Sequence, residues 1–341
     1  MSKILTPITL GKTTVKNRIV MPPMCTYKAK NNNGFPRCFH NLHYATRALG
    51  GVGLIIVEAT AVEARGRITN DDLGLWNDEQ IEYHKELVKQ CHKFGASIAV
   101  QLAHAGRKSE CDDSRCVAPS AIKFSEKYSE PLELSLEEIA SIKEAFVQAG
   151  KRAVAAGYDL VELHAAHGYL LHEFLSPLTN LRKDEFGGSF ENRVKLLCEV
   201  MDGLRCEGVE FGVRISADEW EVGGFGLDDS LKLAKLIQDF GGVYIHVSAG
   251  GNHEKPSLVP KFVPFYQCDY AKEIKKVVNL PVIAVGLITT PSQGEALLLG
   301  DVCDMVAYGR ELLKNPNLAF YAMSEFKENE LIEKSYLRAF V

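Results

Sequence analysis

Residues 135–164 read SLEEIASIKEAFVQAGKRAVAAGYDLVELH, and this stretch decides the fold class. Ser135 and Glu138 have the spacing of a capping box, in which two side chains satisfy free amide groups at the start of a helix. Apolar residues then recur at helical spacing as far as Gly157, a residue type that often ends helices. The short apolar run at 160–164 is typical of a strand buried on both faces of a parallel sheet. The stretch therefore predicts a helix followed by a parallel strand.

The same alternation of helix and strand continues along the whole chain. Short apolar runs predict eight strands, at residues 18–21, 52–58, 97–101, 160–164, 211–216, 243–248, 281–285 and 305–308. Helical periodicity fills most intervals and is clearest at 77–94, 135–156, 191–207, 228–240 and 269–277. We expect Asp228 to cap the fourth of these helices. Eight strands alternating with helices predict an α/β fold, a single (β/α)8 TIM barrel.

The chain shows no linker of low complexity and no break in composition, so we expect one domain over residues 1–341. No GxGxxG motif follows the first strand, which argues against an open dinucleotide-binding sheet. Two long excursions interrupt the alternation, residues 105–134 after the third strand and residues 168–189 after the fourth. Long loops on a barrel are more often functional than accidental.

Composition and charge exclude several classes of partner. Hydrophobic residues make up 46% of the chain, charged residues 24%, and the net charge is −5. No run of Lys and Arg is present, so a nucleic-acid partner is not expected. No signal peptide and no membrane-spanning apolar window can be found, which predicts a cytoplasmic protein that does not bind membranes. The nine cysteines include no CxxC pair, and we expect reduced thiols; Cys111 and Cys116 stay open as a disulfide or metal-binding pair.

Polar residues gather where the predicted strands end, which is the end of a barrel that carries the active site. Gly286 follows the seventh strand, and Gly309 and Arg310 follow the eighth. These are the loops in which barrels favour a phosphate group, because glycines let backbone amides approach it and an arginine adds charge. The alternative is that the glycines only satisfy tight turns.

His164 and His167, at the end of the fourth strand, allow three interpretations. They can bind a metal together with a further ligand such as His104, donate hydrogen bonds to a carbonyl oxygen or oxyanion, or serve the structure alone. Tyr169 beside them is a weak acid suited to delivering a proton to a carbanion. Arg214, within an apolar strand, needs either a salt bridge to Glu58 or Asp218 or contact with an anionic cofactor ring.

Ordered motifs cover nearly the whole chain and resemble the old yellow enzyme family of FMN-dependent ene-reductases. The most specific runs from His164 to Asn180, HAAHGYLLHEFLSPLTN, and others are QLAHAGR at 101–107 and Gly309-Arg310. Cys25 and the two histidines are similar to those of the bacterial, thermophilic-type subgroup. Because no adjacent base would make Cys25 a thiolate, we expect it to pack or to tune redox chemistry.

The resemblance implies a role for each matching residue. His164 and His167 would bind the substrate carbonyl, Tyr169 would be the proton donor, and Tyr27 would line the substrate pocket. The FMN contacts would be Pro22, Pro23, Met24, Cys25, Ala59, Gln101, Arg214, Gly286, Gly309 and Arg310. Arg338 would reach the active site of a neighbouring subunit, which implies a homodimer or homotetramer.

The implied activity is a ping-pong reduction of the C=C bond of α,β-unsaturated carbonyl compounds. NADPH or NADH would supply the hydride to bound FMN, and no metal would be required. The chain departs from the family at 28–40, a segment that borders the substrate side, and Trp220 and Phe225 have no clear parallel. The physiological substrate therefore does not follow from the resemblance.

Overall fold

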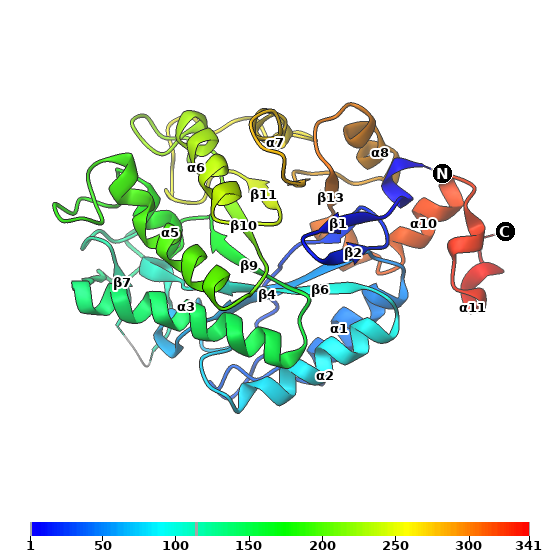
Figure 1. Ribbon diagram of the computed structural model, residues 1–341, viewed down its shortest axis with the longest axis horizontal. Helices are drawn as coiled ribbons and strands as arrows, with labels where there is room; N and C mark the ends of the chain where they lie inside the picture. Colours follow the sequence, from blue (N-terminus) through cyan, green and yellow to red (C-terminus); the bar gives the residue numbers. More distant parts are fainter. Residues whose placement is uncertain (1, 113–114, 341) are drawn as a thin grey trace.

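Eight parallel strands close into a barrel in a computed structural model that describes residues 2–112 and 115–340. Residues 1 and 341, the limits of the predicted domain, lie outside the described residues. The strands are β3 (Ile19–Met21), β4 (Leu54–Ala61), β6 (Ser97–Ala103), β9 (Leu160–Ala165), β10 (Phe211–Ser216), β11 (Ile245–Ser248), β12 (Val282–Ala284) and β13 (Met305–Ala307). Pairing of β3 with both β13 and β4 closes the barrel, which confirms the predicted fold (Figure 1).

All eight predicted strands are present, and β10 has the predicted bounds. The largest difference is in β4, which continues to Ala61 through a register shift between Val57 and Thr60. The predicted excursions are also present. The first contains η3 (Gly106–Lys108), β7 (Val117–Ala118) and β8 (Leu132–Glu133), and the second contains α4 (Leu170–Leu175).

The five helices predicted most clearly are α2 (Gln80–Lys93), α3 (Leu136–Ala156), α5 (Phe190–Cys206), α6 (Leu227–Asp239) and α7 (Cys268–Lys275). The capping box of Ser135 and Glu138 is confirmed, and Gly157 ends α3 at φ 90°. The predicted cap of α6 is wrong, because Gly226 holds the cap position and Asp228 lies in the first turn. There its negative charge still favours the positive end of the helix dipole.

Further elements complete the fold. The helices among them are η1 (Lys3–Leu5), α1 (Cys38–Leu49), η2 (Ala64–Gly66), α8 (Pro291–Leu299), α9 (Gly309–Lys314), α10 (Leu318–Glu325), η4 (Asn329–Leu331) and α11 (Lys334–Leu337), and β5 (Leu73–Gly74) is a short strand paired with β4. Within residues 2–112 and 115–340, no helix is both long enough and apolar enough to cross a membrane.

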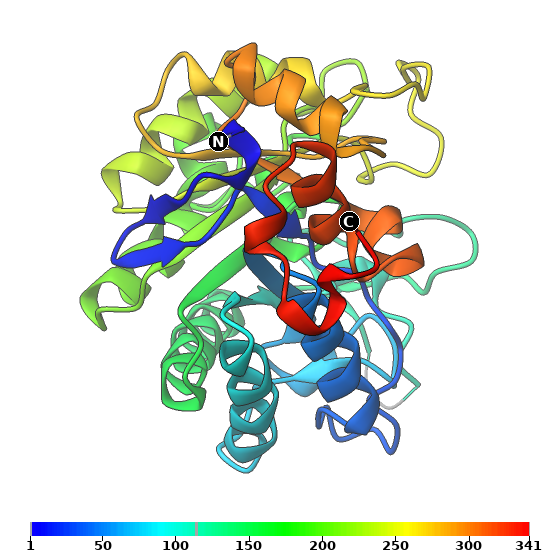
Figure 2. The same ribbon diagram turned by 90° about the vertical axis from the view of Figure 1, so that its right-hand side faces the viewer.

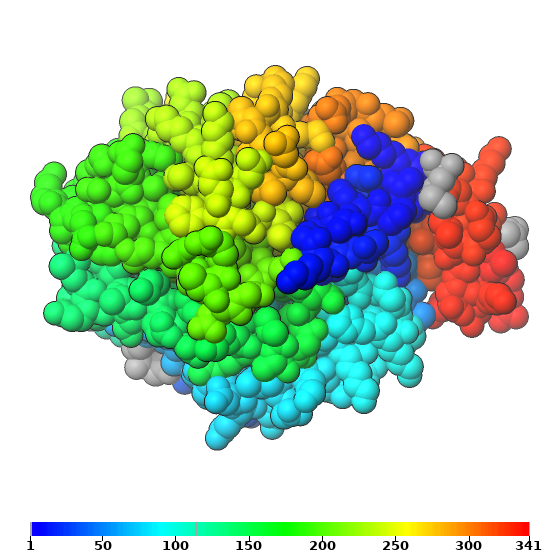
Figure 3. Space-filling view, viewed as in Figure 1, coloured from blue at the N-terminus to red at the C-terminus, as the bar shows by residue number. Residues whose placement is uncertain are grey.

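An N-terminal hairpin of β1 (Ile8–Leu10) and β2 (Thr13–Val15) covers the amino end of the barrel. Leu10 and Val15 are fully buried and pack with Leu54 and Leu160 from the barrel strands. Figure 3 shows the hairpin, in blue, on the outer surface of the molecule. The barrel interior is therefore closed at its amino end by apolar side chains, and it is open to ligands at the carboxyl end alone.

Alternation along the strands places every second side chain inside the barrel. On β9 the apolar Leu160 belongs to the interior cluster near the amino end, followed by the buried Glu162 and then His164. The interior thus changes from apolar to polar toward the carboxyl end, and the polar layer forms the floor of the site.

The two ends of the chain lie side by side (Figures 1 and 2). The Ser2 amide donates a hydrogen bond of 2.6 Å to Glu328 Oε1, just after α10. Phe340 packs against Tyr321 of α10 with ring centroids 5.1 Å apart. Arg338, directly after α11, is exposed on this outer surface.

We expect Gly212→Ala to destabilise the barrel by about 2 kcal/mol, the usual effect of overpacking a core. A Cβ atom at Gly212 would lie 2.3 Å from the ring of Tyr244 inside the barrel. Urea unfolding measures the change. The substitution is then repeated in a Tyr244→Leu background, which lacks the clashing ring atoms; an equally large loss there would contradict the explanation.

Candidate active site

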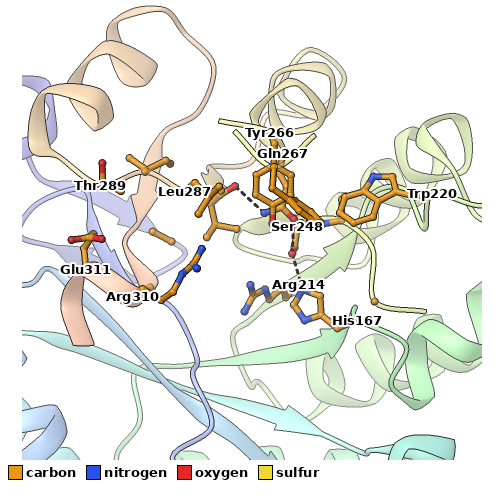
Figure 4. Close-up of a pocket in the computed structure, with 18 of the residues that line it drawn as sticks. His167, Arg214, Trp220, Ser248, Tyr266, Gln267, Leu287, Thr289, Arg310 and Glu311 are labelled. Atoms are coloured by element: carbon orange, nitrogen blue, oxygen red, sulfur yellow. Dashed lines mark hydrogen bonds between the residues drawn. The ribbon is translucent and has the colours of Figure 1, made fainter. Parts of the chain in front are cut away.

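A cavity of about 730 Å³ opens at the carboxyl ends of the barrel strands, where barrel enzymes hold their active sites (Figure 4). Side chains reach it from loops and strand ends that are far apart in the sequence. Those used below are His167, Arg214, Trp220, Ser248, Phe262, Tyr266, Gln267, Gly286, Gly309 and Arg310.

His164, His167 and Tyr169 are brought together at the end of β9. The ring centroids of His164 and His167 lie 5.2 Å apart, and those of His164 and Tyr169 lie 4.9 Å apart. His167 Nε2 is 2.7 Å from Ser248 Oγ, whereas His164 Nδ1 is buried with no hydrogen-bond partner among the described residues. The free nitrogen of His164 marks a position where a ligand atom can bind.

Burial fixes the protonation states of these groups. Burial, and then the charge of Arg214, lowers the pKa of His164 and His167 well below the usual value of 6.5. Burial raises the pKa of Tyr169 well above 10.0 and also raises the pKa of the Cys25 thiol. The two imidazoles are therefore neutral at pH 7, and the phenol and the thiol keep their protons.

A tight turn holds the segment between the histidines and Tyr169. His167 and Gly168 adopt φ of 59° and 73°, and a Cβ atom at Gly168 would lie 2.4 Å from the carbonyl oxygen of Gly251. Lys108 Nζ donates 2.9 Å to the carbonyl oxygen of His167 and lies 4.9 Å from the ring centroid of Tyr169. The position of Tyr169 therefore depends on a glycine and on a lysine from the first excursion.

The predicted salt bridge of Arg214 is wrong. Glu58 is engaged by the hydroxyls of Thr26 and Tyr44, and Asp218 accepts from the backbone amide of Trp220. Across the part of the chain that the structure describes, neither carboxylate forms an ion pair with Arg214. Burial lowers the pKa of Arg214, and the charge of Glu162 opposes this shift.

Glu162 organises the polar layer under the cavity, a role that the sequence analysis missed. Its carboxylate accepts from Gln101 Nε2 at 2.8 Å and from the Tyr244 hydroxyl at 3.2 Å, and it contacts His246 Nδ1 at 2.9 Å. The Nε atom of Arg214 nearby is buried, and it has no hydrogen-bond partner in the described chain. The layer therefore presents one polar atom upward without a partner.

The predicted phosphate residues line the other end of the cavity. Gly286 adopts φ 146°, a conformation that L side chains rarely take, and Gly309 and Arg310 lie beside it. A Cβ atom at Gly309 would contact Pro22 at 3.7 Å and Met24 at 3.6 Å, which places the segment after β3 against this end. Glycine amides and an arginine in one concave site suit a phosphate group.

The remaining predicted residues divide into two groups. Cys25 and Tyr169 pack against the buried Ala59, and Tyr27, 45% exposed, hydrogen-bonds to Cys25. Pro23 follows Pro22 in the same segment. Arg338 does not line the cavity of its own chain.

No metal cluster is found. In residues 2–112 and 115–340, no group of three or more His, Cys, Asp or Glu residues could hold a metal ion. His104 is engaged with Glu63 at 2.9 Å, and Cys111 and Cys116 are free thiols, so neither alternative raised by the sequence is formed.

The fold and this cavity define a barrel enzyme for a planar, phosphorylated cofactor. The family model described as NADH:flavin oxidoreductase / NADH oxidase matches residues 3–329, and the chain belongs to this family. It is 44% identical over 341 residues to an NADPH dehydrogenase of Listeria monocytogenes, with 99% of each chain covered. It is also 45% identical over 327 residues to an NADPH dehydrogenase of a Geobacillus species, with 94% of each covered.

Solved structures agree with these relatives. Morphinone reductase superposes with a TM-score of 0.80 at 28% identity, covering 93% of this chain and 88% of that one. The old yellow enzyme homologue from Zymomonas mobilis gives 0.81 at 29% identity, covering 95% and 92%. The resemblance to old yellow enzymes is therefore confirmed, and the protein is a flavin-dependent oxidoreductase with FMN as its cofactor.

The residues of the cavity fit FMN. The unpartnered, buried Arg214 Nε and His164 Nδ1 face a site that lacks their partners, as a bound heteroaromatic ring would supply. At the other end, Gly286, Gly309 and Arg310 suit the phosphate. The two sets of groups lie in one continuous cavity, with Gln267 between them.

His172 in α4 supports the catalytic turn, because its Nδ1 accepts from the Gly168 amide at 2.9 Å. Burial lowers the pKa of His172 to about 4, whereas unfolded histidine titrates near 6.5. The unfolded chain therefore binds a proton below pH 6.5 that the folded chain does not, and folding stability falls with the pH. The variant His172→Asn keeps an acceptor for Gly168 but cannot titrate. Between pH 7 and pH 5 we expect wild type to lose about 2 kcal/mol relative to this variant.

Urea unfolding at each pH measures this difference. The matched control is His92→Asn on the surface, because hydrogen bonding to Asp159 raises the pKa of His92. Its wild-type contribution is present below pH 6.5 and lost at higher pH, so the relative stability changes in the opposite direction. The same direction of change for both histidines would contradict the assignment.

Proposed function

We propose that this oxidoreductase reduces the C=C bond of α,β-unsaturated carbonyl compounds in a ping-pong reaction. The observation that carries the proposal is the juxtaposition of two neutral imidazoles, His164 and His167, with the protonated phenol of Tyr169. A pair of hydrogen-bond donors and a nearby weak acid are what the reduction of an enone requires.

His164 and His167 bind the carbonyl oxygen of the substrate and stabilise the negative charge that develops there. The hydroxyl of Ser248 lies 2.7 Å from His167 Nε2 and 3.2 Å from Gln267 Oε1. We assign its proton to the nearer nitrogen, which leaves the hydrogen of His167 on Nδ1, free to be donated to the substrate.

Tyr169 delivers the proton to the α-carbon. The ammonium group of Lys108, 4.9 Å from the ring centroid, favours the tyrosinate that remains afterwards. Burial lowers the pKa of Lys108 to about 8, so most of the lysine still carries its charge at pH 7. Lys108 thus assists proton transfer while it holds the carbonyl group of His167.

Ten residues hold FMN in this proposal, and they divide by the part of the cofactor they contact. Gly286, Gly309 and Arg310 bind the phosphate, while Arg214 favours negative charge on the pyrimidine edge. The other contacts are Pro22, Pro23, Met24, Cys25, Ala59 and Gln101. The chemistry that FMN supplies when bound is hydride transfer, from the nicotinamide to the flavin and from the flavin to the β-carbon.

The relatives named NADPH dehydrogenase support NADPH as the hydride donor. We further propose a homodimer or homotetramer in which Arg338 enters the neighbouring active site, where Tyr27 also lines the substrate pocket. The exposure of Arg338 outside its own cavity is compatible with this role. The single domain and the cytoplasmic location stay predictions.

Tyr169→Phe tests the proposed function directly. We expect the reaction of the reduced enzyme with cyclohexenone to slow by about 100-fold or more, because the proton donor is lost. Flavin reduction by NADPH should keep its rate. Anaerobic stopped-flow absorbance measures each half-reaction, and equal losses in both would remove Tyr169 from the donor role. Wild-type enzyme that is reduced by NADPH but not reoxidised by any enone would overturn the proposed function.

His164→Ala is expected to weaken phenol binding about tenfold, because a buried hydrogen bond to the phenolate oxygen is lost. Titration of the holoenzyme with phenol, followed by the flavin absorbance, gives the Kd. His92→Ala, on the far surface of the barrel, serves as the control. Unchanged phenol affinity in His164→Ala would show that this histidine does not anchor the substrate oxygen.

A further inference from the structure

One side of the cavity is made of three aromatic rings, Trp220, Phe262 and Tyr266, which we call the aromatic wall. Ring centroids are 6.0 Å apart for Trp220 and Phe262, 6.2 Å for Trp220 and Tyr266, and 5.2 Å for Phe262 and Tyr266. Figure 4 shows Trp220 and Tyr266 at the side of the cavity away from Arg310. None of the proposed catalytic steps uses these rings.

The wall is a fixed feature rather than a chance contact between loops. Trp220 adopts φ 62°, a strained conformation for a bulky residue that persists only where its surroundings hold it. Its amide donates 2.7 Å to Asp218, its carbonyl oxygen accepts 2.8 Å from Leu258, and its indole N–H donates 3.3 Å to Tyr270. A Cβ atom at Gly250 would lie 2.3 Å from the indole, so only a glycine there leaves room for the ring.

The wall and Tyr169 lie on opposite sides of the substrate anchor. Around the barrel, β9 with its histidines stands between β6 and β10. Tyr169 packs on the side of β4 and β6, against Ala59 and Ala103. The wall comes from the loops after β10 and β11, and only Gly250 and Gly251 separate Trp220 from His167.

This arrangement orients a bound enone. If the carbonyl oxygen lies at the histidines and the α-carbon faces Tyr169, the second substituent of the carbonyl carbon points away from Tyr169, toward the wall. Phe262 is 58% exposed, so a planar ring placed there would bury apolar surface and stack or pack edge to face.

Resting on the proposed function, we propose that the aromatic wall is a subsite for an aromatic ring attached to the carbonyl carbon of the substrate. The substrate class it selects is the α,β-unsaturated aryl ketone. A ring attached to the β-carbon would leave the anchor in another direction and would not reach the wall.

Two isomeric enones test this inference with the full-length holoenzyme. In 1-phenylbut-2-en-1-one the phenyl group is on the carbonyl carbon, and in 4-phenylbut-3-en-2-one it is on the β-carbon. The ratio of their kcat/KM values is measured for wild type and for Phe262→Ala, an exposed position where the fold is not at risk. We expect the ratio to fall about tenfold in favour of the β-aryl isomer, as loss of one aromatic contact and its apolar burial predicts.

Leu258→Ala is the matched control, because Leu258 is an exposed apolar residue on the same loop that does not line the cavity. It should leave the ratio at the wild-type value, and Phe262→Tyr should restore it. An unchanged ratio in Phe262→Ala, or an equal fall for both isomers, would overturn the subsite. So would a wild type that reduces cyclohexenone but not 1-phenylbut-2-en-1-one, whereas no reduction of any enone would overturn the proposed function instead.

Acetophenone gives a second readout that does not depend on turnover, since it carries the aryl ketone but no alkene. Its Kd, from flavin absorbance, should rise about tenfold in Phe262→Ala and stay unchanged in Leu258→Ala. Equal affinities in wild type and Phe262→Ala would contradict the inference.

Discussion

The buried carboxylate of Glu162 is the interaction on which the active site depends. A carboxylate inside a barrel is unfavourable unless it is hydrogen-bonded and paired, and Glu162 receives contacts from Gln101, Tyr244 and His246 while lying near the charge of Arg214. These groups come from neighbouring strands, so one acid fixes the relative positions of several strands at the height of the cavity floor. The same acid allows an arginine to be kept inside an otherwise apolar barrel, where its free Nε is available to a ligand.

The sequence predicted the barrel because strands buried on both faces appear as plain apolar runs, and β10 was placed with its full bounds. Helix α3 was equally clear, since its capping box and terminal glycine are local signals. Helix α1 (Cys38–Leu49) was missed. Its cap position is Arg37, which lacks the residue type that marks helix starts, and it follows an atypical loop.

Prediction of the site succeeded where the chemistry follows the strand order and failed where it depends on distant loops. His164, His167 and Tyr169 are neighbours in the sequence, and the structure places them together. Glu162 lies two residues before His164 on the same face of β9, so strand alternation alone would have indicated it. Lys108 and Trp220 could not have been found in this way, because contacts with other loops set their positions.

The closing pair of strands has a consequence for synthesis of the chain. Strand β3 pairs with β13, Ile19 opposite Val306, so the first barrel strand has to wait for the last one before its second edge is covered. While the chain emerges from the ribosome, that edge exposes unpaired amide and carbonyl groups, the kind of surface that chaperones protect. Contacts so remote in sequence also slow folding. The contact between Ser2 and Glu328 belongs to the same late event, and the native barrel is completed only after translation has nearly ended.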